Sequence, residues 1–213
     1  MSSDLLQGFF ESLTGQIITV VVIILLFTGI LISGKGKKLD TNAMVSSAIL
    51  VALAIALNQI VLFRMPQGGS VTAFSMLPIV ICAIFYGLRR GLMAGMCVGL
   101  IDLIFNPYVI HPVQMILDYP LAFGALAFSS LLFTKKFGII PAYLFGVTCR
   151  YFCAVLSGIV FFGQYAPEGF NAVTWSLWYN LTYLGAEAVL TTLLLSIPNI
   201  RKIIYRLREK AIL

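Results

Sequence analysis

The feature that most constrains this chain is a series of long apolar segments separated by short turns. A bilayer-spanning helix needs about twenty mainly apolar residues. With 60% hydrophobic and only 10% charged residues, the chain has too few polar side chains to cover a water-soluble globule. We therefore expect an all-α integral membrane protein. Seven candidate spans lie near residues 16–33, 43–63, 72–88, 91–105, 113–133, 138–162 and 172–197.

The charged residues predict the orientation of these spans. Asp4 and Glu11 precede the first apolar run, where a signal peptide would carry positive charge, and a basic cluster follows at 35–38. We therefore expect this run to remain as an anchor with the N-terminus outside. Alternation from this start places twelve of the fourteen basic residues inside, as the positive-inside rule requires. The two exceptions are Arg64 and Arg150.

The apolar runs leave no room for a soluble domain between them. The expected organisation is an additional N-terminal transmembrane helix with a basic inner loop (1–40), a six-helix core (41–198) and a basic cytoplasmic tail (199–213). The tail mixes basic residues with Ile203 and Leu207, which suits a helix lying on an anionic inner leaflet. A solvated extension of the last span is the alternative.

Several classes of chemistry lack their sequence signatures. The chain has no HExxH, GxSxG or P-loop pattern, so we expect neither an enzyme nor an ATPase. The net charge of +6 comes from short clusters between apolar runs, which does not favour a nucleic-acid partner. We expect no metal or cofactor, because the single His111 has no acidic company and its expected role is a helix cap or a loop hydrogen bond. The four cysteines are expected to be small buried hydrophobes: Cys82, Cys97, Cys149 and Cys153.

Four ionisable side chains fall inside the apolar runs, namely Asp102, Asp118, Arg150 and Glu187. Such groups are costly in a membrane, so each is a functional candidate. Three acids against one arginine leave surplus negative charge, which a cationic ligand would relieve. Asp102 is either part of that site or an outer-loop acid that reaches water, and Glu187 is expected to pair with Arg150.

The outer half of the predicted bundle is rich in rings and amides. Rings of this kind stack on a flat heteroaromatic ligand or face a cation, and amides orient it. An interfacial aromatic belt is the alternative, and it is favoured for Trp178 and Tyr179. The full set is Tyr108, Gln114, Tyr119, Phe162, Gln164, Tyr165, Trp175, Trp178, Tyr179 and Asn180.

Two helix faces carry small residues. Ala48, Ala52 and Ala56 form one stripe on which another helix can approach closely. Spacing alone does not distinguish docking of a partner from packing inside the same bundle. Ala94 and Gly95 make a second small face.

Several strings together resemble the thiamine-specific substrate-binding subunits of energy-coupling factor (ECF) transporters. The resemblance covers roughly residues 43–198. The strings around Asp118 and Tyr165 are specific, whereas the alanine stripe is shared by many such subunits. Besides that stripe, the strings are residues 88–91 (LRRG), 111–114 (HPVQ), 117–122 (LDYPLA), 161–169 (FFGQYAPEG) and 175–177 (WSL), with Asn180.

The resemblance implies a six-helix core that binds thiamine near the outer face of a bacterial cell membrane. It also implies a transmembrane coupling subunit and two cytoplasmic ATPase subunits, which would hydrolyse the ATP. Asp118 and Tyr119 match residues that bind the aminopyrimidine ring, and Tyr108, Trp175 and Asn180 match other ligand-contacting positions.

Two positions depart from the family pattern. Ala154 stands where histidine is frequent, and Phe162 aligns with a tryptophan that helps to enclose the thiazolium ring. These departures keep a thiamine precursor or another heteroaromatic vitamin open as the cargo. From a different functional class, a membrane sensor or anchor that transports nothing is the remaining alternative.

Overall fold

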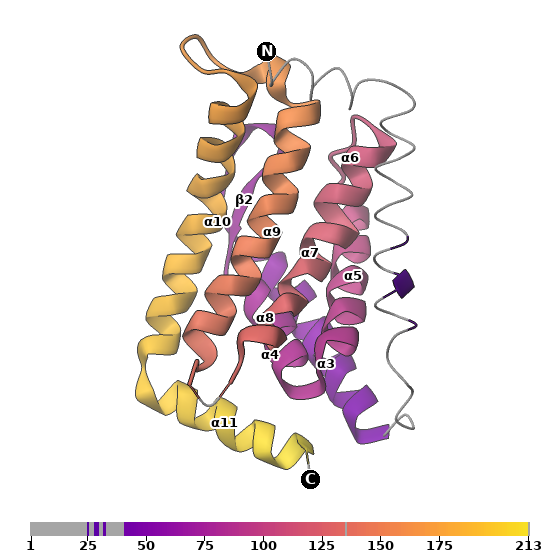
Figure 1. Ribbon diagram of the computed structural model, residues 1–213, viewed down its shortest axis with the longest axis vertical. Helices are drawn as coiled ribbons and strands as arrows, with labels where there is room; N and C mark the ends of the chain where they lie inside the picture. The colour runs from indigo at the N-terminus through magenta and orange to yellow at the C-terminus, as the bar shows by residue number, and fades with distance from the viewer. Residues whose placement is uncertain (1–24, 26–27, 30–31, 33–40, 135, 213) are drawn as a thin grey trace.

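The computed structural model describes residues 41–134 and 136–212, together with residues 25, 28, 29 and 32. The predicted segment 1–40 therefore lies almost entirely outside the described residues and stays a prediction. Long helices stand along the molecule, and the C-terminal helix lies across one end (Figure 1). The helices are α3 (Thr41–Asn58), α4 (Met76–Tyr86), α5 (Leu88–Phe105), α6 (Pro112–Ile116), α7 (Ala122–Ala125), α8 (Ser129–Leu132), α9 (Ile139–Phe161), α10 (Ala172–Ser196) and α11 (Pro198–Ile212).

Each of the six remaining predicted spans contains a helix, so the all-α prediction is confirmed for the described part of the chain. By length and apolar composition, α3, α9 and the rod from Pro112 to Leu132 can each cross a bilayer, and α10 with α11 passes as a bent pair. Helix α4 has only 11 residues, about 16 Å. Helix α5 carries Arg89 and Arg90 in its first turn. Helices α4 and α5 therefore need packing against neighbouring helices to stay within the bundle.

The predicted span 43–63 is wrong at its C-terminal end, because β1 (Val61–Arg64) is a strand. It pairs antiparallel with β2 (Ser70–Thr72). Gln67 and Gly68 reverse the chain between them with φ values of 64° and 89°, in the left-handed region that turns require. Strand β2 contacts α10 and runs behind α9 and α10 in Figure 1. The chain between α3 and α4 is therefore a hairpin that returns onto the bundle.

The small face of α5 packs inside the bundle. A Cβ atom added to Gly95 would collide with the carbonyl of Phe123, and one added to Gly99 would collide with the carbonyl of Tyr119. Only glycine permits this backbone-to-backbone approach. The approach fixes α5 against the rod that contains α6, α7 and α8.

That rod contains a π-helical turn, Leu117–Leu121, with Pro120 inside it. Proline has no N–H to donate to the preceding turn, which accounts for the interruption of the α-helical ladder. Single π turns of this kind re-aim side chains and often occur at functional sites. Here the turn carries Asp118 and Tyr119.

The alanine stripe of α3 lies on the outside of the bundle. Ala48, Ala52 and Ala56 are all exposed, whereas Ala43 and Ala54 on the other side of the helix are buried. Of the two explanations that the spacing allowed, packing of the stripe inside the bundle is therefore wrong for the described part of the chain.

A single large cluster of buried side chains joins the helices. Tyr143 of α9 and Phe123 of α7 are its largest fully buried members, and Met76, Ile79 and Val80 extend it into α4. Because α4 contributes to this cluster along most of its length, it can be short and still be held in the bundle.

We expect Gly99→Ala to destabilise the protein by about 1–3 kcal/mol, because the new methyl group must displace the Tyr119 backbone. Thermal unfolding of the purified protein measures this effect. Gly185→Ala in α10 is the matched control, since its methyl group would meet only the flexible Leu181 side chain, at 3.5 Å. Equal melting temperatures for the two variants would contradict the close approach of α5.

Candidate ligand-binding pocket

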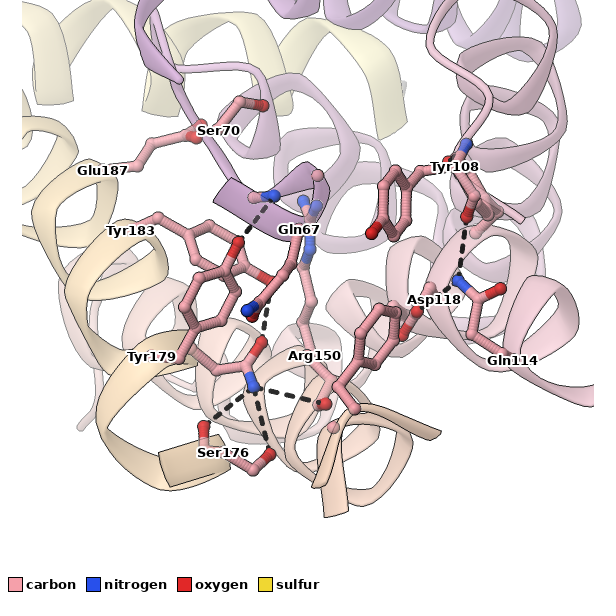
Figure 2. A pocket seen from close by; sticks show the side chains of 18 of the residues that line it. Gln67, Ser70, Tyr108, Gln114, Asp118, Arg150, Ser176, Tyr179, Tyr183 and Glu187 are labelled. Carbon is pink, nitrogen blue, oxygen red and sulfur yellow. Dashed lines mark hydrogen bonds between the residues drawn. The ribbon is translucent and has the colours of Figure 1, made fainter. Parts of the chain in front are cut away.

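A pocket opens between the hairpin, the loop after α5, the π turn, α9 and α10. It encloses about 880 Å³ of space, counting the part that is open to solvent. Figure 2 shows Tyr108, Gln114 and Asp118 on one side and Ser176, Tyr179 and Tyr183 on the other. The pocket thus brings together residues from segments far apart in the sequence.

The acidic side is organised by Gln114, which is almost fully buried. Its amide nitrogen donates to Asp118 Oδ2 at 2.7 Å and to the Tyr108 carbonyl at 3.1 Å. Its amide oxygen accepts from the Ile110 N–H at 3.2 Å. Gln114 therefore fixes the Asp118 carboxyl group and the loop that carries Tyr108 in one arrangement.

Tyr119 holds the same loop from the π turn. Its hydroxyl accepts from the Tyr108 N–H and donates to the Asn106 carbonyl, both at 2.8 Å. Because both bonds go to the backbone, the hydroxyl positions the loop, while the Tyr119 ring lines the pocket.

The opposite side is organised around Asn180. Its amide nitrogen donates to the Ser176 carbonyl at 2.8 Å and lies 3.4 Å from the Ala154 carbonyl of α9. Its amide oxygen accepts from the Tyr183 hydroxyl at 2.9 Å. These bonds fix the orientation of the Asn180 amide and tie α10 to α9.

The hairpin turn closes over α10. The Tyr179 hydroxyl accepts from the Gly69 N–H at 3.0 Å and donates to the Pro66 carbonyl. A Cβ atom on Gly68 would lie 3.0 Å from the Tyr108 ring. The turn therefore touches both sides of the pocket.

Aromatic rings line the pocket near the loops. Phe162 and Tyr108 stack with ring centroids 5.9 Å apart and an interplanar angle of 23°. Trp175 lies 5.6 Å from Tyr179, measured between ring centroids. The Trp175 Nε1–H is buried and has no acceptor in the described part of the chain. A bound molecule with an acceptor at that position would satisfy it.

The predicted ion pair between Glu187 and Arg150 is wrong. Glu187, 3% exposed, instead accepts from the hydroxyl groups of Thr72 (2.7 Å) and Ser75 (3.1 Å) and from the N–H groups of Thr72 (3.3 Å) and Met76 (3.2 Å). The Arg150 guanidinium lies over the Phe123 ring, 3.8 Å from its centroid. Enough donors converge at the start of α4 to satisfy the carboxylate without an arginine.

The pocket lining carries two carboxyl groups, Asp118 and Glu187, against one guanidinium, Arg150. Its formal charge is therefore −1. Because Glu187 is saturated with hydrogen bonds from the protein, Asp118 is the acid best placed to meet a ligand.

Seven of the eight predicted ligand residues line this one pocket: Tyr108, Gln114, Asp118, Tyr119, Phe162, Trp175 and Asn180. Asp102 does not line it. The Asp102 Oδ1 atom accepts from Asn58 Nδ2 at 2.5 Å and from Asn106 Nδ2 at 2.9 Å. The two amides hold the Asp102 carboxylate beside the pocket. Through its hydrogen bond, Asp102 in turn fixes the side chain of Asn58, which does line the pocket.

The interfacial-belt prediction was wrong for Tyr179, which is 8% exposed and lines the pocket, whereas Trp178 is 57% exposed. The residues that sequence reasoning missed belong mainly to the hairpin, over Gln67–Thr72, and include Tyr183 of α10. The glycines at 68 and 69 signalled a turn. No pattern in the sequence indicated that the turn folds back onto α10.

The remaining polar candidates have structural partners. His111 caps α6, with Nδ1 accepting from the Val113 N–H at 3.1 Å, as predicted. The cysteines are free, but only Cys82 is buried and Cys97 is exposed. Among the described residues, no group of three or more histidine, cysteine or acidic side chains could hold a metal ion.

We expect Glu187→Gln to destabilise the ligand-free protein by about 1–3 kcal/mol, because an amide NH₂ group would replace an acceptor that faces four donors. Glu168→Gln makes the same change at an exposed position and should alter stability by less than about 0.5 kcal/mol. Thermal unfolding of both variants tests this network, and an equal effect would contradict it.

Comparisons with known proteins show the family of the chain. The family model described as thiamine transporter protein (Thia_YuaJ) matches residues 44–205. The thiamine transporter ThiT of Bacillus subtilis (strain 168) is 34% identical in an alignment 168 residues long, which covers 71% of this chain and 87% of that protein. ThiT of Lacticaseibacillus paracasei is 31% identical in an alignment 172 residues long, which covers 71% of this chain and 81% of that protein.

A solved structure of ThiT from Listeria monocytogenes is also similar. The two structures superpose with a TM-score of 0.62 at 28% sequence identity. The matched region covers 80% of this chain and 96% of the Listeria chain. The relatives are named as transporters rather than enzymes. From the family match and the apolar helices we conclude that the chain is a multi-pass membrane protein of the thiamine transporter (Thia_YuaJ) family.

Proposed function

We propose that this chain captures thiamine in the pocket and delivers it as the substrate-binding subunit of an ATP-driven ECF importer. The observation that carries the proposal is the convergence on one pocket of Asp118, Phe162, Trp175 and Asn180, which come from three separate segments of the chain. The names of the relatives support thiamine as the cargo.

The chemistry of the pocket fits a flat cation with an exocyclic amine. The pyrimidine amino group of thiamine donates to Asp118, whose carboxyl group is held by Gln114. The thiazolium ring faces Phe162 and Trp175, and each desolvated cation–π contact contributes about 2 kcal/mol. The formal charge of −1 favours thiamine over its phosphate esters.

The distribution of charge supports an orientation with the pocket outside and the C-terminus in the cytoplasm. Basic residues lie at the start of α5 (Arg89 and Arg90), just before α9 (Lys136) and along α11. Helix α11 bonds to the end of α4 and the start of α9, so these segments meet at the end of the bundle that α11 crosses (Figure 1). Cytoplasmic loops are enriched in such residues. In a bacterial cell membrane the pocket then opens to the exterior.

The alanine stripe supports docking to a transmembrane coupling subunit. Ala48, Ala52 and Ala56 are exposed small residues on which a second helix can approach closely. Because the chain has no P-loop pattern, the work of transport comes from two separate ATPase subunits attached to that partner.

We expect Asp118→Asn to weaken thiamine binding at least tenfold, because a charged hydrogen bond contributes about 1.5–3 kcal/mol. Quenching of tryptophan fluorescence measures the dissociation constant. A Trp178→Phe background leaves Trp175, in the pocket, as the reporter. Asp102→Asn, beside the pocket, is the matched control and should change affinity less than threefold. Similar losses in both variants would remove Asp118 from the site.

The same titration distinguishes the candidate cargoes. We expect thiamine to bind more tightly than its precursor pyrimidine, which lacks the cationic ring, and more tightly than thiamine phosphate. Tighter binding of the pyrimidine would identify the precursor as the cargo. It would also connect the family departures at Ala154 and Phe162 to this difference in specificity.

We expect Ala52→Phe to abolish thiamine uptake in cells that carry the complete importer, while thiamine binding to the purified chain stays within threefold. The bulky ring prevents close approach of a partner helix, and it is accommodated at Ala52 because this position is exposed in the described part of the chain. Leu144→Phe, at an exposed position of α9, is the control and should transport normally. Loss of binding in Ala52→Phe would contradict docking.

A further inference from the structure

The turn of the hairpin holds a glutamine in a backbone conformation that favours glycine. Gln67 has φ 64° and ψ 25°, in the left-handed region that residues with a Cβ atom rarely adopt. Glycine takes this conformation without strain, as Gly68 does next in the chain with φ 89°. Non-glycine residues in this region cluster at ligand sites, where the surrounding structure holds them in place. The geometry of the turn alone would favour glycine at position 67.

Backbone bonds hold the turn without the Gln67 side chain. The Met65 N–H donates to the Gly69 carbonyl at 2.7 Å. The Tyr179 hydroxyl accepts from the Gly69 N–H at 3.0 Å and donates to the Pro66 carbonyl. The turn is therefore fastened on both sides of Gln67, and its backbone sets the direction in which the side chain leaves.

The Gln67 side chain is partly buried and lines the pocket. Figure 2 shows it extending from the hairpin into the space between Tyr179 and Tyr108. Three other amide side chains line the pocket, and each bonds to a protein group: Asn58, Gln114 and Asn180. The Gln67 amide alone among the four has no hydrogen-bond partner in the described part of the chain. It is therefore free to bond to a ligand.

The turn lies at the aromatic end of the pocket. A Cβ atom on Gly68 would lie 3.0 Å from the ring of Tyr108, and that ring stacks on Phe162. The Tyr179 ring, whose hydroxyl bonds to the turn, lies 5.6 Å from Trp175 between centroids. The turn thus adjoins the neighbours of both rings that face the thiazolium ring in the proposed binding mode. The hydroxyethyl group on that ring then ends near the free amide.

We infer that the Gln67 amide binds the hydroxyl group of the ligand and so selects a cargo with an alcohol beside its cationic ring. The amide oxygen accepts the hydroxyl hydrogen. A hydroxyl group that enters the pocket loses its hydrogen bond to water, and the amide replaces that bond. Esterification removes the hydroxyl hydrogen, which gives a second reason for weak binding of thiamine phosphate. The inference rests on the proposed function and names a further specificity-determining residue of the same site.

The tryptophan titration in the Trp178→Phe background tests this bond with two ligands, thiamine and an analogue whose hydroxyethyl group is replaced by ethyl. With Gln67 present, thiamine should bind about fivefold more tightly than the analogue, as expected for one neutral hydrogen bond. We expect Gln67→Leu to weaken thiamine binding about fivefold and to leave the analogue within about twofold. Gln59→Leu makes the same change at an exposed position outside the pocket and should alter neither affinity.

A second variant, Gln67→Gly, separates the side chain from the turn. Because glycine adopts φ 64° without strain, thermal unfolding of this variant should occur at the same temperature or higher. Thiamine binding should still weaken about fivefold. A residue that served the turn alone would show no such loss.

Three results would overturn the inference. One is an unchanged thiamine affinity in Gln67→Leu, and another is an unchanged affinity in Gln67→Gly. The third is an equal loss for both ligands in Gln67→Leu, which would place the bond on another part of the ligand. In each case binding of thiamine by the unmodified chain would leave the proposed function intact. If the unmodified chain does not bind thiamine, the proposed function fails together with this inference.

Discussion

Inside a bilayer a polar group must find its partner within the protein, because lipid supplies neither donors nor acceptors and an unsatisfied group costs several kcal/mol. This constraint organises the polar interior of the chain. Glu187 takes four donors from the hairpin and the start of α4. Asp102 takes two asparagine amides. Asn180 connects α10 to α9 and to Tyr183.

The pocket is one place where this satisfaction is incomplete. The buried Trp175 Nε1–H has no partner in the described part of the chain. Asp118 is oriented by Gln114 but faces a space that has a formal surplus of one negative charge. A ligand with an acceptor for the Trp175 Nε1–H, and with a donor and a positive charge for Asp118, would stabilise these groups. The ligand chemistry of the pocket therefore follows from the polar groups whose charge or hydrogen bond the surrounding network does not satisfy.

Backbone geometry decides where Asp118 lies. Pro120 interrupts the α-helical hydrogen bonds inside the π turn. Gly99 lets α5 approach the backbone of that turn directly. The hairpin, held by Tyr179 and Glu187, then forms a further wall. The rigid parts of the site thus depend on glycine and proline positions that carry no polar chemistry of their own.

The sequence by itself determined the membrane class, the presence of a helix in each of the six predicted spans of the described part, the cap at His111 and seven of the residues that line the pocket. It could do so because apolar run length, loop charge and residue type act locally along the chain. Tertiary structure decided that Glu187 bonds to Thr72 and Ser75 rather than to Arg150, that Asp102 lies outside the pocket and that Tyr179 lies inside it. It also decided that the alanine stripe faces outward and that the hairpin returns over α10. These outcomes depend on which side of a helix faces which neighbour, and more than one hundred residues separate Thr72 from Glu187 along the chain, a distance over which no local pattern specifies a partner.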